Sequence, residues 1–164
     1  MRVGDKVVYP GHGPCLLASV VERCIDGKSV SFYQMSVLYD QTVDLFIPVD
    51  KIDGIGLRFL VSKGEIASVL EMLTKAPIVA DNWKLRALDN KRLFSSGSAF
   101  DLATVIKSLT DSSNRKDLSI AEGRLLARAR QLLIGEICEV TGDPGASVEQ
   151  EIDKALSSRD EERV

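Results

Sequence analysis

The sequence is poor in the residue types that carry most enzyme and metal chemistry. It has one histidine, His12, and three cysteines, Cys15, Cys24 and Cys138, none of which forms a C-x-x-C pair. A structural zinc site needs about four such ligands at short spacing, and the chain contains neither a G-x-S-x-G nor a phosphate-loop motif. We therefore expect a protein that is not an enzyme, with no catalytic residues, no cofactor and no metal site.

Long apolar stretches are also absent. No run approaches the roughly 18 residues that are needed to span a bilayer, and the start, MRVGDKVVYP, lacks the apolar segment of a signal peptide. The widely spaced cysteines fit free thiols in a reducing compartment. These features indicate a cytoplasmic protein that does not contact a membrane.

Charge is distributed unevenly along the 164 residues. Residues 57–140 carry 13 basic and 10 acidic side chains, whereas residues 1–56 carry 5 and 7, and residues 141–164 carry 3 and 7. A net charge of -3 is not that of an autonomous DNA-binding protein. Attraction to phosphates nevertheless depends on local charge, so the basic middle could contact DNA if another protein placed it there.

The first third of the chain has the pattern of short strands. Alternation of apolar and polar residues and the hairpin signal Asp26-Gly27 predict a small antiparallel barrel. The expected strands are Lys6–Tyr9, Cys15–Ile25, Ser31–Tyr39 and the alternating segment Val43, Leu45 and Ile47. The stretch from Tyr39 to Ile47 could form a barrel edge, and edge strands invite strand addition by a partner protein.

From residue 58 onward the apolar period becomes helical. Five helices are expected, and their starts are marked by residues that commonly cap helices. The expected capping residues are Ser62 with Glu65, Asp81, Ser98, Ser119 with Glu122, and Ser147 with Gln150. The second helix should end before Gly97 and the fourth near Thr141. The sequence thus predicts an α+β protein with two domains, residues 1–56 and 57–164, which meet near Gly54-Ile55-Gly56.

Trp83 is the only tryptophan, and two interpretations of it remain open. Large aromatic side chains usually pack in a core. The helix that begins beside Trp83 is however rich in basic residues, namely Lys84, Arg86, Lys91 and Arg92. An exposed aromatic residue at the start of such a helix could insert into a minor groove while cations contact phosphates.

Three arginines follow one another on the fourth expected helix: Arg124, Arg128 and Arg130. Arg124 and Arg128 are four residues apart and therefore share a helix face. A solvated face is the ordinary interpretation of such a pattern, and a stripe that faces phosphates is the alternative. The residues alone indicate an interaction protein, either a protein–protein adaptor or a protein that contacts DNA.

Four segments of the chain together resemble the CarD/CdnL family of bacterial RNA polymerase-binding transcription regulators. They are Val3–Pro14 (VGDKVVYPGHGP), Ile47–Arg58 (IPVDKIDGIGLR), Asn82–Arg86 (NWKLR) and Leu118–Ile137 (LSIAEGRLLARARQLLIGEI). Transcription-repair coupling factors have a similar amino-terminal module, but the helical part with its tryptophan distinguishes the two groups. The resemblance spans almost the whole chain.

The resemblance implies a concrete function. An amino-terminal Tudor/SH3-like module would bind the β subunit of RNA polymerase through a sheet edge. The residues implied for this contact are Arg23, Val43, Leu45, Phe46 and Ile47. The helical domain would contact promoter DNA at the upstream edge of the melted region, where Trp83 wedges into the minor groove and slows closure of the bubble. The residues expected at the DNA are Trp83, Lys84, Arg86, Lys91, Arg124 and Arg128.

The chain departs from the family pattern beside the tryptophan. The family commonly reads W-x-R-R-Y, whereas this chain has Leu85 in place of an arginine and Ala87 in place of the tyrosine. Phe46 also stands at a position that is basic in some relatives. The leading hypothesis is a non-enzymatic regulator, located at the nucleoid through RNA polymerase, that stabilises the promoter open complex. The alternative is an adaptor that uses the barrel edge and whose helices never touch DNA.

Overall fold

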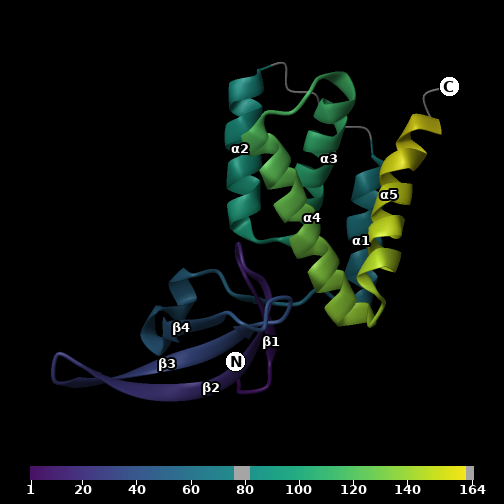
Figure 1. Cartoon of the computed structure of the whole chain (residues 1–164). Helices are drawn as coiled ribbons and strands as arrows, with labels where there is room; N and C mark the ends of the chain where they lie inside the picture. The colour runs from purple at the N-terminus through teal and green to yellow at the C-terminus, as the bar shows by residue number, and fades with distance from the viewer. Residues whose placement is uncertain (76–81, 162–164) are drawn as a thin grey trace. The chain divides into compact units, whose positions relative to one another are not determined.

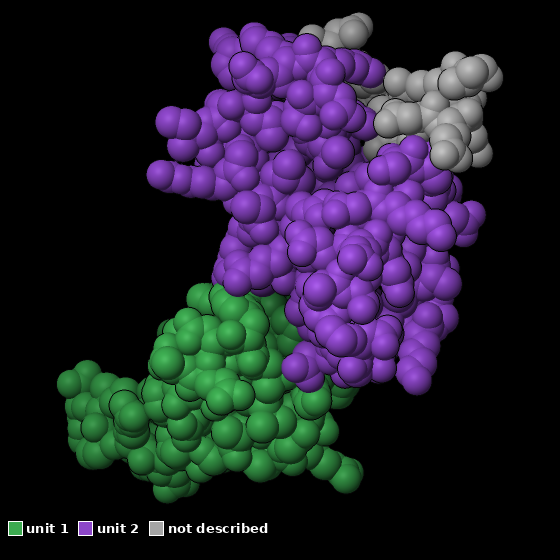
Figure 2. All heavy atoms as spheres, turned by 45° about the vertical axis from the view of Figure 1, so that its right-hand side comes forward, with its two compact units in different colours: residues 1–60 green, residues 61–164 purple. Residues whose placement is uncertain are grey.

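The computed structural model describes residues 1–75 and 82–161. The chain divides into two compact units, Met1–Leu60 and Val61–Val164, which Figure 2 shows in different colours. The first unit is an antiparallel sheet and the second is a set of packed helices, so the predicted α+β class is confirmed. The division comes after residue 60 rather than after the expected residue 56, because a short strand at Arg58–Phe59 still belongs to the sheet.

Unit 1 contains a five-stranded sheet with the strand order β4-β3-β2-β1-β5. Its strands are β1 (Lys6–Tyr9), β2 (Gly13–Ile25), β3 (Lys28–Val37), β4 (Asp44–Pro48) and β5 (Arg58–Phe59), with the 3-10 helix η1 (Val49–Gly54) between the last two. The four predicted strands are present; β1 has the predicted bounds, and the ends of the other three are shifted. Strand β5 corrects the expectation that the helical period begins at residue 58.

Strands β2 and β3 form a long hairpin that extends beyond the other strands (Figure 1). Its turn is the predicted pair Asp26 and Gly27, whose φ angles of 51° and 77° lie in the left-handed region that such a turn requires. A bulge lies between Leu17 and Ser19. Because a bulge inserts one residue into one strand only, it reverses which β2 side chains face the core from this point on.

The core of unit 1 lies on one face of the sheet. Its buried side chains are Val7, Cys15, Leu17, Met35, Val37 and Ile47. Tyr33 is half-buried and packs against this cluster, so Tyr33, Met35 and Val37 form the inner face of β3. The opposite face carries Phe32, Gln34 and Ser36, which leaves one side of the sheet available to solvent.

The described residues of unit 2, 61–75 and 82–161, form five helices (Figure 1). They are α1 (Lys63–Thr74), α2 (Trp83–Ser96), α3 (Ala99–Arg115), α4 (Ile120–Thr141) and α5 (Gly145–Glu161). Helix α3 is central, because it packs against α1, α2 and α4, and α5 packs against α1 and α4. Fully buried side chains of α3 such as Leu102, Val105 and Ile106 form the middle of the core. None of the helices in residues 1–75 and 82–161 is long and apolar enough to cross a membrane.

Most predicted helix ends are correct because they depend on local chemistry. Ser62 and Glu65 form a complete capping box, with the Glu65 N–H donating to Ser62 Oγ at 3.2 Å and the Ser62 N–H donating to Glu65 Oε2 at 2.7 Å. Ser98 and Ser119 also cap their helices as predicted. Gly97, with φ of 73°, ends α2 in the left-handed conformation that glycine adopts without strain.

Two predicted helix starts differ in the structure. Helix α2 is capped by Asn82, and Asp81, which was expected in this role, lies outside the described residues. Helix α5 begins at Gly145, before the expected cap Ser147. The carbonyl of Pro144 accepts hydrogen bonds from the N–H groups of Ser147 at 3.1 Å and Val148 at 3.2 Å. The first turn therefore closes on Pro144, and Ser147 lies inside the helix.

Candidate functional site

The first candidate site is the start of α2. Asn82 Oδ1 accepts hydrogen bonds from the N–H groups of Lys84 at 3.0 Å and Leu85 at 3.4 Å, so a side-chain cap fixes the first helical turn. Trp83 is the first helical residue and is 64% exposed. The ammonium group of Lys84 lies 5.6 Å from the centre of the Trp83 ring. The interpretation of Trp83 as a core residue is therefore wrong.

The way in which α2 attaches to the bundle explains this exposure. Asn90 is the only fully buried residue of α2, and its Nδ2 donates a hydrogen bond to Ser108 Oγ of α3 at 3.3 Å. Leu93 and Phe94, in the following turn, are half-buried against the helical core. The second half of α2 thus holds the helix to α3. Trp83 lies about two turns before Asn90 and extends past these contacts.

The side chains of α2 are distributed unevenly about its axis. At about 100° per residue, Ala87 lies about 40° and Lys91 about 80° from Trp83. Lys84 lies about 100° from Trp83 and within about 20° of Lys91, so two exposed lysines lie on one flank of the aromatic ring. Arg86 lies on the other flank of Trp83 and is half-buried. Three of the expected cations therefore flank the tryptophan.

The opposite side of α2 has a different character. Leu85 and Leu88 lie there, with exposed fractions of 57% and 64%. Arg92 is also on this side and pairs with Asp89 at 3.7 Å in a well-exposed ion pair. Of the two departures from the family pattern, Leu85 thus faces away from Trp83, whereas Ala87 stands between Trp83 and Lys91.

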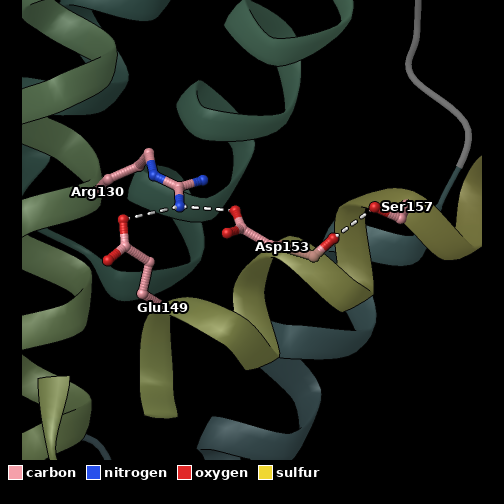
Figure 3. Close-up of polar contacts among 4 residues, drawn as sticks. All are labelled: Arg130, Glu149, Asp153 and Ser157. Carbon is pink, nitrogen blue, oxygen red and sulfur yellow. Dashed lines mark hydrogen bonds and ion pairs between the residues drawn. The ribbon is translucent and has the colours of Figure 1, made fainter. Parts of the chain in front are cut away.

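The three arginines of helix α4 fall into two groups by their contacts. Arg124 is exposed, and Arg128, one turn later on the same face, donates from Nη1 to Gln131 Oε1 at 2.9 Å. Arg130 instead binds α5: Figure 3 shows its Nη2 between Asp153 Oδ1 at 2.7 Å and Glu149 Oε1 at 3.5 Å. Arg130 therefore joins two helices, whereas Arg124 and Arg128 keep the shared face that the sequence predicts.

The structure brings some of the expected DNA-binding residues from α2 and α4 toward one end of unit 2. Helices α2 and α3 run antiparallel, as do α3 and α4, so α2 and α4 begin at the same end, at the top of Figure 1. Trp83 and Lys84 stand at the start of α2, and Arg124 lies in the second turn of α4. Ile120, the first residue of α4, is 78% exposed at this end.

The second candidate site is the edge of the sheet in unit 1. Strand β4 is last in the strand order and pairs only with β3. The Val43 carbonyl accepts a hydrogen bond from the Val37 N–H at 3.1 Å. Because alternate residues of an antiparallel strand bond to the same neighbour, Leu45 and Ile47 also face β3. The backbone groups of Asp44 and Phe46 consequently point toward the open edge.

The side chains of this edge follow the same alternation. Val43 and Leu45 are half-buried and Ile47 is 4% exposed, and all three pack in the core of unit 1. These three expected polymerase-binding residues thus anchor β4 in the core, and the backbone groups that point to the open edge belong to Asp44 and Phe46. Phe46 points to the outer face and is 41% exposed, and the guanidinium carbon of Arg23 lies 4.6 Å from its ring centre.

A tight turn sets the position of β4. Asp40 Oδ1 accepts hydrogen bonds from the hydroxyl of Thr42 at 2.6 Å and from its N–H at 3.1 Å. The Thr42 hydroxyl, followed by its N–H, lowers the pKa of Asp40 from its ordinary value of 3.8. The Val43 N–H also donates to the Asp40 carbonyl at 3.0 Å. The ionised carboxylate therefore stabilises the turn that leads into the edge strand.

Sequence reasoning missed some exposed features of both sites. Leu85, Leu88 and Ile120 are apolar and lie in helices, and the apolar pattern alone does not show that they face solvent. The contact between Arg23 and Phe46 also has no signal in the sequence, because the two residues are on strands separated by β3. Only a correct register of the sheet could have suggested it.

No group of three or more His, Cys, Asp or Glu side chains within the described residues could hold a metal ion. Burial raises the pKa of the Cys15 thiol to about 11. Burial, followed by the nearby charges of Glu139 and Asp143, raises the pKa of the Cys138 thiol. Both thiols are therefore protonated at neutral pH, the opposite of what thiolate chemistry requires.

Comparison with protein families gives two matches that together cover nearly the whole chain. Residues 1–61 match the family described as CarD-like/TRCF RID domain, and residues 65–153 match the family described as CarD, C-terminal domain. The matches correspond to units 1 and 2 of the structure. The chain therefore belongs to the CarD/CdnL family, whose members are RNA polymerase-interacting transcription regulators and not enzymes.

Proposed function

We propose that this protein binds the β subunit of RNA polymerase through the β4 edge and stabilises the promoter open complex by inserting Trp83 at the upstream edge of the bubble. The observation that carries the proposal is the exposure of Trp83, 64%, at the start of a helix with Lys84 beside its ring. An apolar side chain that inserts between base steps must be exposed before binding.

The polymerase contact is supported by the geometry of β4. Asp44 and Phe46 direct backbone groups toward the open edge, and an incoming strand can pair with such groups. Val43, Leu45 and Ile47 anchor the strand in the core, so the edge is already ordered before a partner arrives. An ordered edge lowers the conformational entropy that is lost on binding. Arg23 and Phe46 supply exposed side chains beside this edge.

The DNA contact is supported by local charge around Trp83. Lys84 and Lys91 lie on one flank of the indole ring and Arg86 lies on the other, and α4 adds Arg124 and Arg128. These cations would contact phosphates and position the protein, whereas Trp83 would act on the bases. The net charge of -3 opposes binding to free DNA, so we expect the contact only when polymerase holds the protein at a promoter. Such a protein acts in the cytoplasm, at the nucleoid.

The alternative is an adaptor whose helices never touch DNA. It requires a structural role for Trp83, with the ring packed in the core. The exposed ring argues against this alternative. A single substitution separates the two functions, because loss of a buried tryptophan unfolds a domain, whereas loss of an exposed one leaves it folded.

The test is Trp83→Ala, compared with Leu88→Ala, which removes an equally exposed apolar side chain from the other side of α2. Stacking of an aromatic side chain on a base is worth about 1–3 kcal/mol, so Trp83→Ala should shorten the open-complex lifetime about 5- to 150-fold. Polymerase affinity and the melting temperature should stay unchanged for both variants, and Leu88→Ala should keep the normal lifetime. A loss of about 3–5 kcal/mol of stability in Trp83→Ala, as for a core residue, would contradict the proposal.

A further inference from the structure

The outer face of the sheet contains an ordered arginine. Arg23 lies on β2 opposite Val30, and Phe46 lies on β4 opposite Gln34, with β3 between them. The Arg23 side chain therefore crosses the outer face of β3 to place its guanidinium 4.6 Å from the centre of the Phe46 ring. A cation over an aromatic face at this distance is an attractive contact. It brings a charge from the hairpin to the edge strand.

Other polar groups near the edge are already paired. Asp44 Oδ1 accepts a hydrogen bond from Ser36 Oγ at 2.8 Å, and its Oδ2 accepts one from Gln34 Nε2 at 3.1 Å. Both oxygens of the carboxylate on β4 are thus engaged by β3. Within residues 1–75 and 82–161, Arg23 makes no ion pair. Its guanidinium keeps its N–H donors in the plane of the group, and this fork matches a carboxylate.

We propose that Phe46 is a positioning residue that holds Arg23 at the β4 edge, where the guanidinium pairs with an acidic side chain of the polymerase segment that docks there. This inference rests on the proposed polymerase contact. Guanidinium groups commonly stack on aromatic rings, and in that arrangement the edge of the group keeps its donors for a bidentate bond. A ring at position 46 thus directs the positive charge of Arg23 without adding one of its own.

The first measurement is made on the free full-length protein and needs no polymerase. The ring of Phe46 should shift the NMR signals of the Arg23 side chain, and Phe46→Leu should remove this shift, whereas Phe46→Tyr should retain it. Phe46→Leu keeps an apolar side chain on the same strand, so the sheet is expected to remain folded. If Phe46→Leu leaves the Arg23 signals unchanged, the proposal is overturned, whether or not the protein binds polymerase.

The second measurement is the affinity for RNA polymerase in a double-mutant cycle. A cation–π contact at an exposed site corresponds to about a two- to five-fold change in affinity, so Phe46→Leu should weaken binding by about this factor. Arg23→Gln should weaken binding more than about ten-fold and flatten its salt dependence, because a charge-assisted bond is lost. In a protein that already carries Arg23→Gln, Phe46→Leu should have no further effect on the affinity. In a protein that keeps Arg23, Phe46→Tyr should retain the normal affinity.

Each other result has a defined meaning. An equal loss from Phe46→Leu with and without Arg23 would make Phe46 a direct contact and overturn the positioning role. An unchanged salt dependence in Arg23→Gln would overturn the acidic partner. If the NMR shift is present but neither substitution changes polymerase affinity, the assignment of the β4 edge as the polymerase contact fails together with the inference, while the DNA contact of Trp83 is unaffected.

Discussion

Two consecutive basic residues on α2 provide a strict test of the proposal that the Trp83 side of this helix contacts DNA. Lys91 and Arg92 are both exposed. At about 100° per residue, Lys91 lies about 80° from Trp83, and Arg92 lies about 180° from it. Arg92 already pairs with Asp89 at 3.7 Å. Lys91→Gln and Arg92→Gln remove the same charge one residue apart, so a difference between them reports geometry and not net charge.

The expected size of the effect follows from counterion release. One phosphate contact contributes about 0.9 to the slope of log affinity against log salt. Raising salt from about 50 to about 200 mM therefore weakens one contact by about 3.5-fold. Lys91→Gln should shorten the open-complex lifetime more at low salt than at high salt. The ratio of the normal lifetime to the lifetime with Lys91→Gln should fall by about 3.5-fold between the two salt concentrations. Arg92→Gln should show the normal lifetime at every salt concentration.

The assay is the half-life of the polymerase–promoter complex after a competitor is added, with saturating amounts of each variant. Polymerase affinity is measured in parallel and should be the same for both variants, because α2 lies in unit 2 and the β4 edge lies in unit 1. Equal effects of Lys91→Gln and Arg92→Gln would refute the assignment of the Trp83 side as the DNA face. The assignment would also be refuted if neither substitution altered the salt dependence of the open-complex lifetime.

Three further predictions concern the units themselves. Residues 1–60 alone should bind RNA polymerase in a pull-down assay; binding by residues 61–164 instead would contradict the assignment of the contact to the sheet. Arg130→Met removes two ion pairs to α5, so it should destabilise unit 2 by about 1 kcal/mol in thermal melts and leave the open-complex lifetime normal. Burial raises the pKa of Cys15 from 9.0 to about 11, so the unfolded chain loses this proton first and the free energy of unfolding should fall from about pH 9 to 11 in urea titrations. Cys15→Val should abolish that fall.

Features that depend only on residues close together in the sequence were predictable from it. The turn at Asp26-Gly27 requires only residues that accept a positive φ, and the capping box at Ser62 requires only a serine and a glutamate three residues apart. The start of α5 was not predictable in this way. Ser147 satisfies the same pattern, but the carbonyl of Pro144 closes the first turn earlier.

Features of the sites that depend on tertiary packing were predicted only in part. The sequence placed Trp83 at the start of a basic helix, but its exposure follows from the attachment of α2 to α3 through Asn90, two turns later. In the same way, three arginines on α4 look equivalent in the sequence, and only the position of α5 shows that Arg130 is occupied by Glu149 and Asp153 (Figure 3). Which side of a helix faces a neighbour is not encoded in charge or period alone.

The contact between Arg23 and Phe46 was even less predictable from the sequence. It depends on the register of three strands, and the register of β2 against β3 shifts at the bulge between Leu17 and Ser19. Without the bulge, the alternation would assign Arg23 to the same face of the sheet as Leu17, which is the core face. One inserted residue thus determines on which face the arginine lies.

The division into two units bears on why a weak DNA contact would be sufficient. Each unit has its own hydrophobic core, so either contact can be altered without unfolding the other unit. A protein held by polymerase presents its helical unit to the promoter at an effective concentration of about millimolar. Non-specific DNA binding commonly has a Kd of about 10⁻⁴ to 10⁻⁶ M, below this concentration. Under the proposed function, a few cations beside Trp83 would therefore be enough to hold the promoter on polymerase, and we expect the free protein to bind DNA weakly. We therefore expect a substitution at the β4 edge to abolish the effect of the protein on open-complex lifetime at low protein concentration, and we expect excess protein to restore this effect.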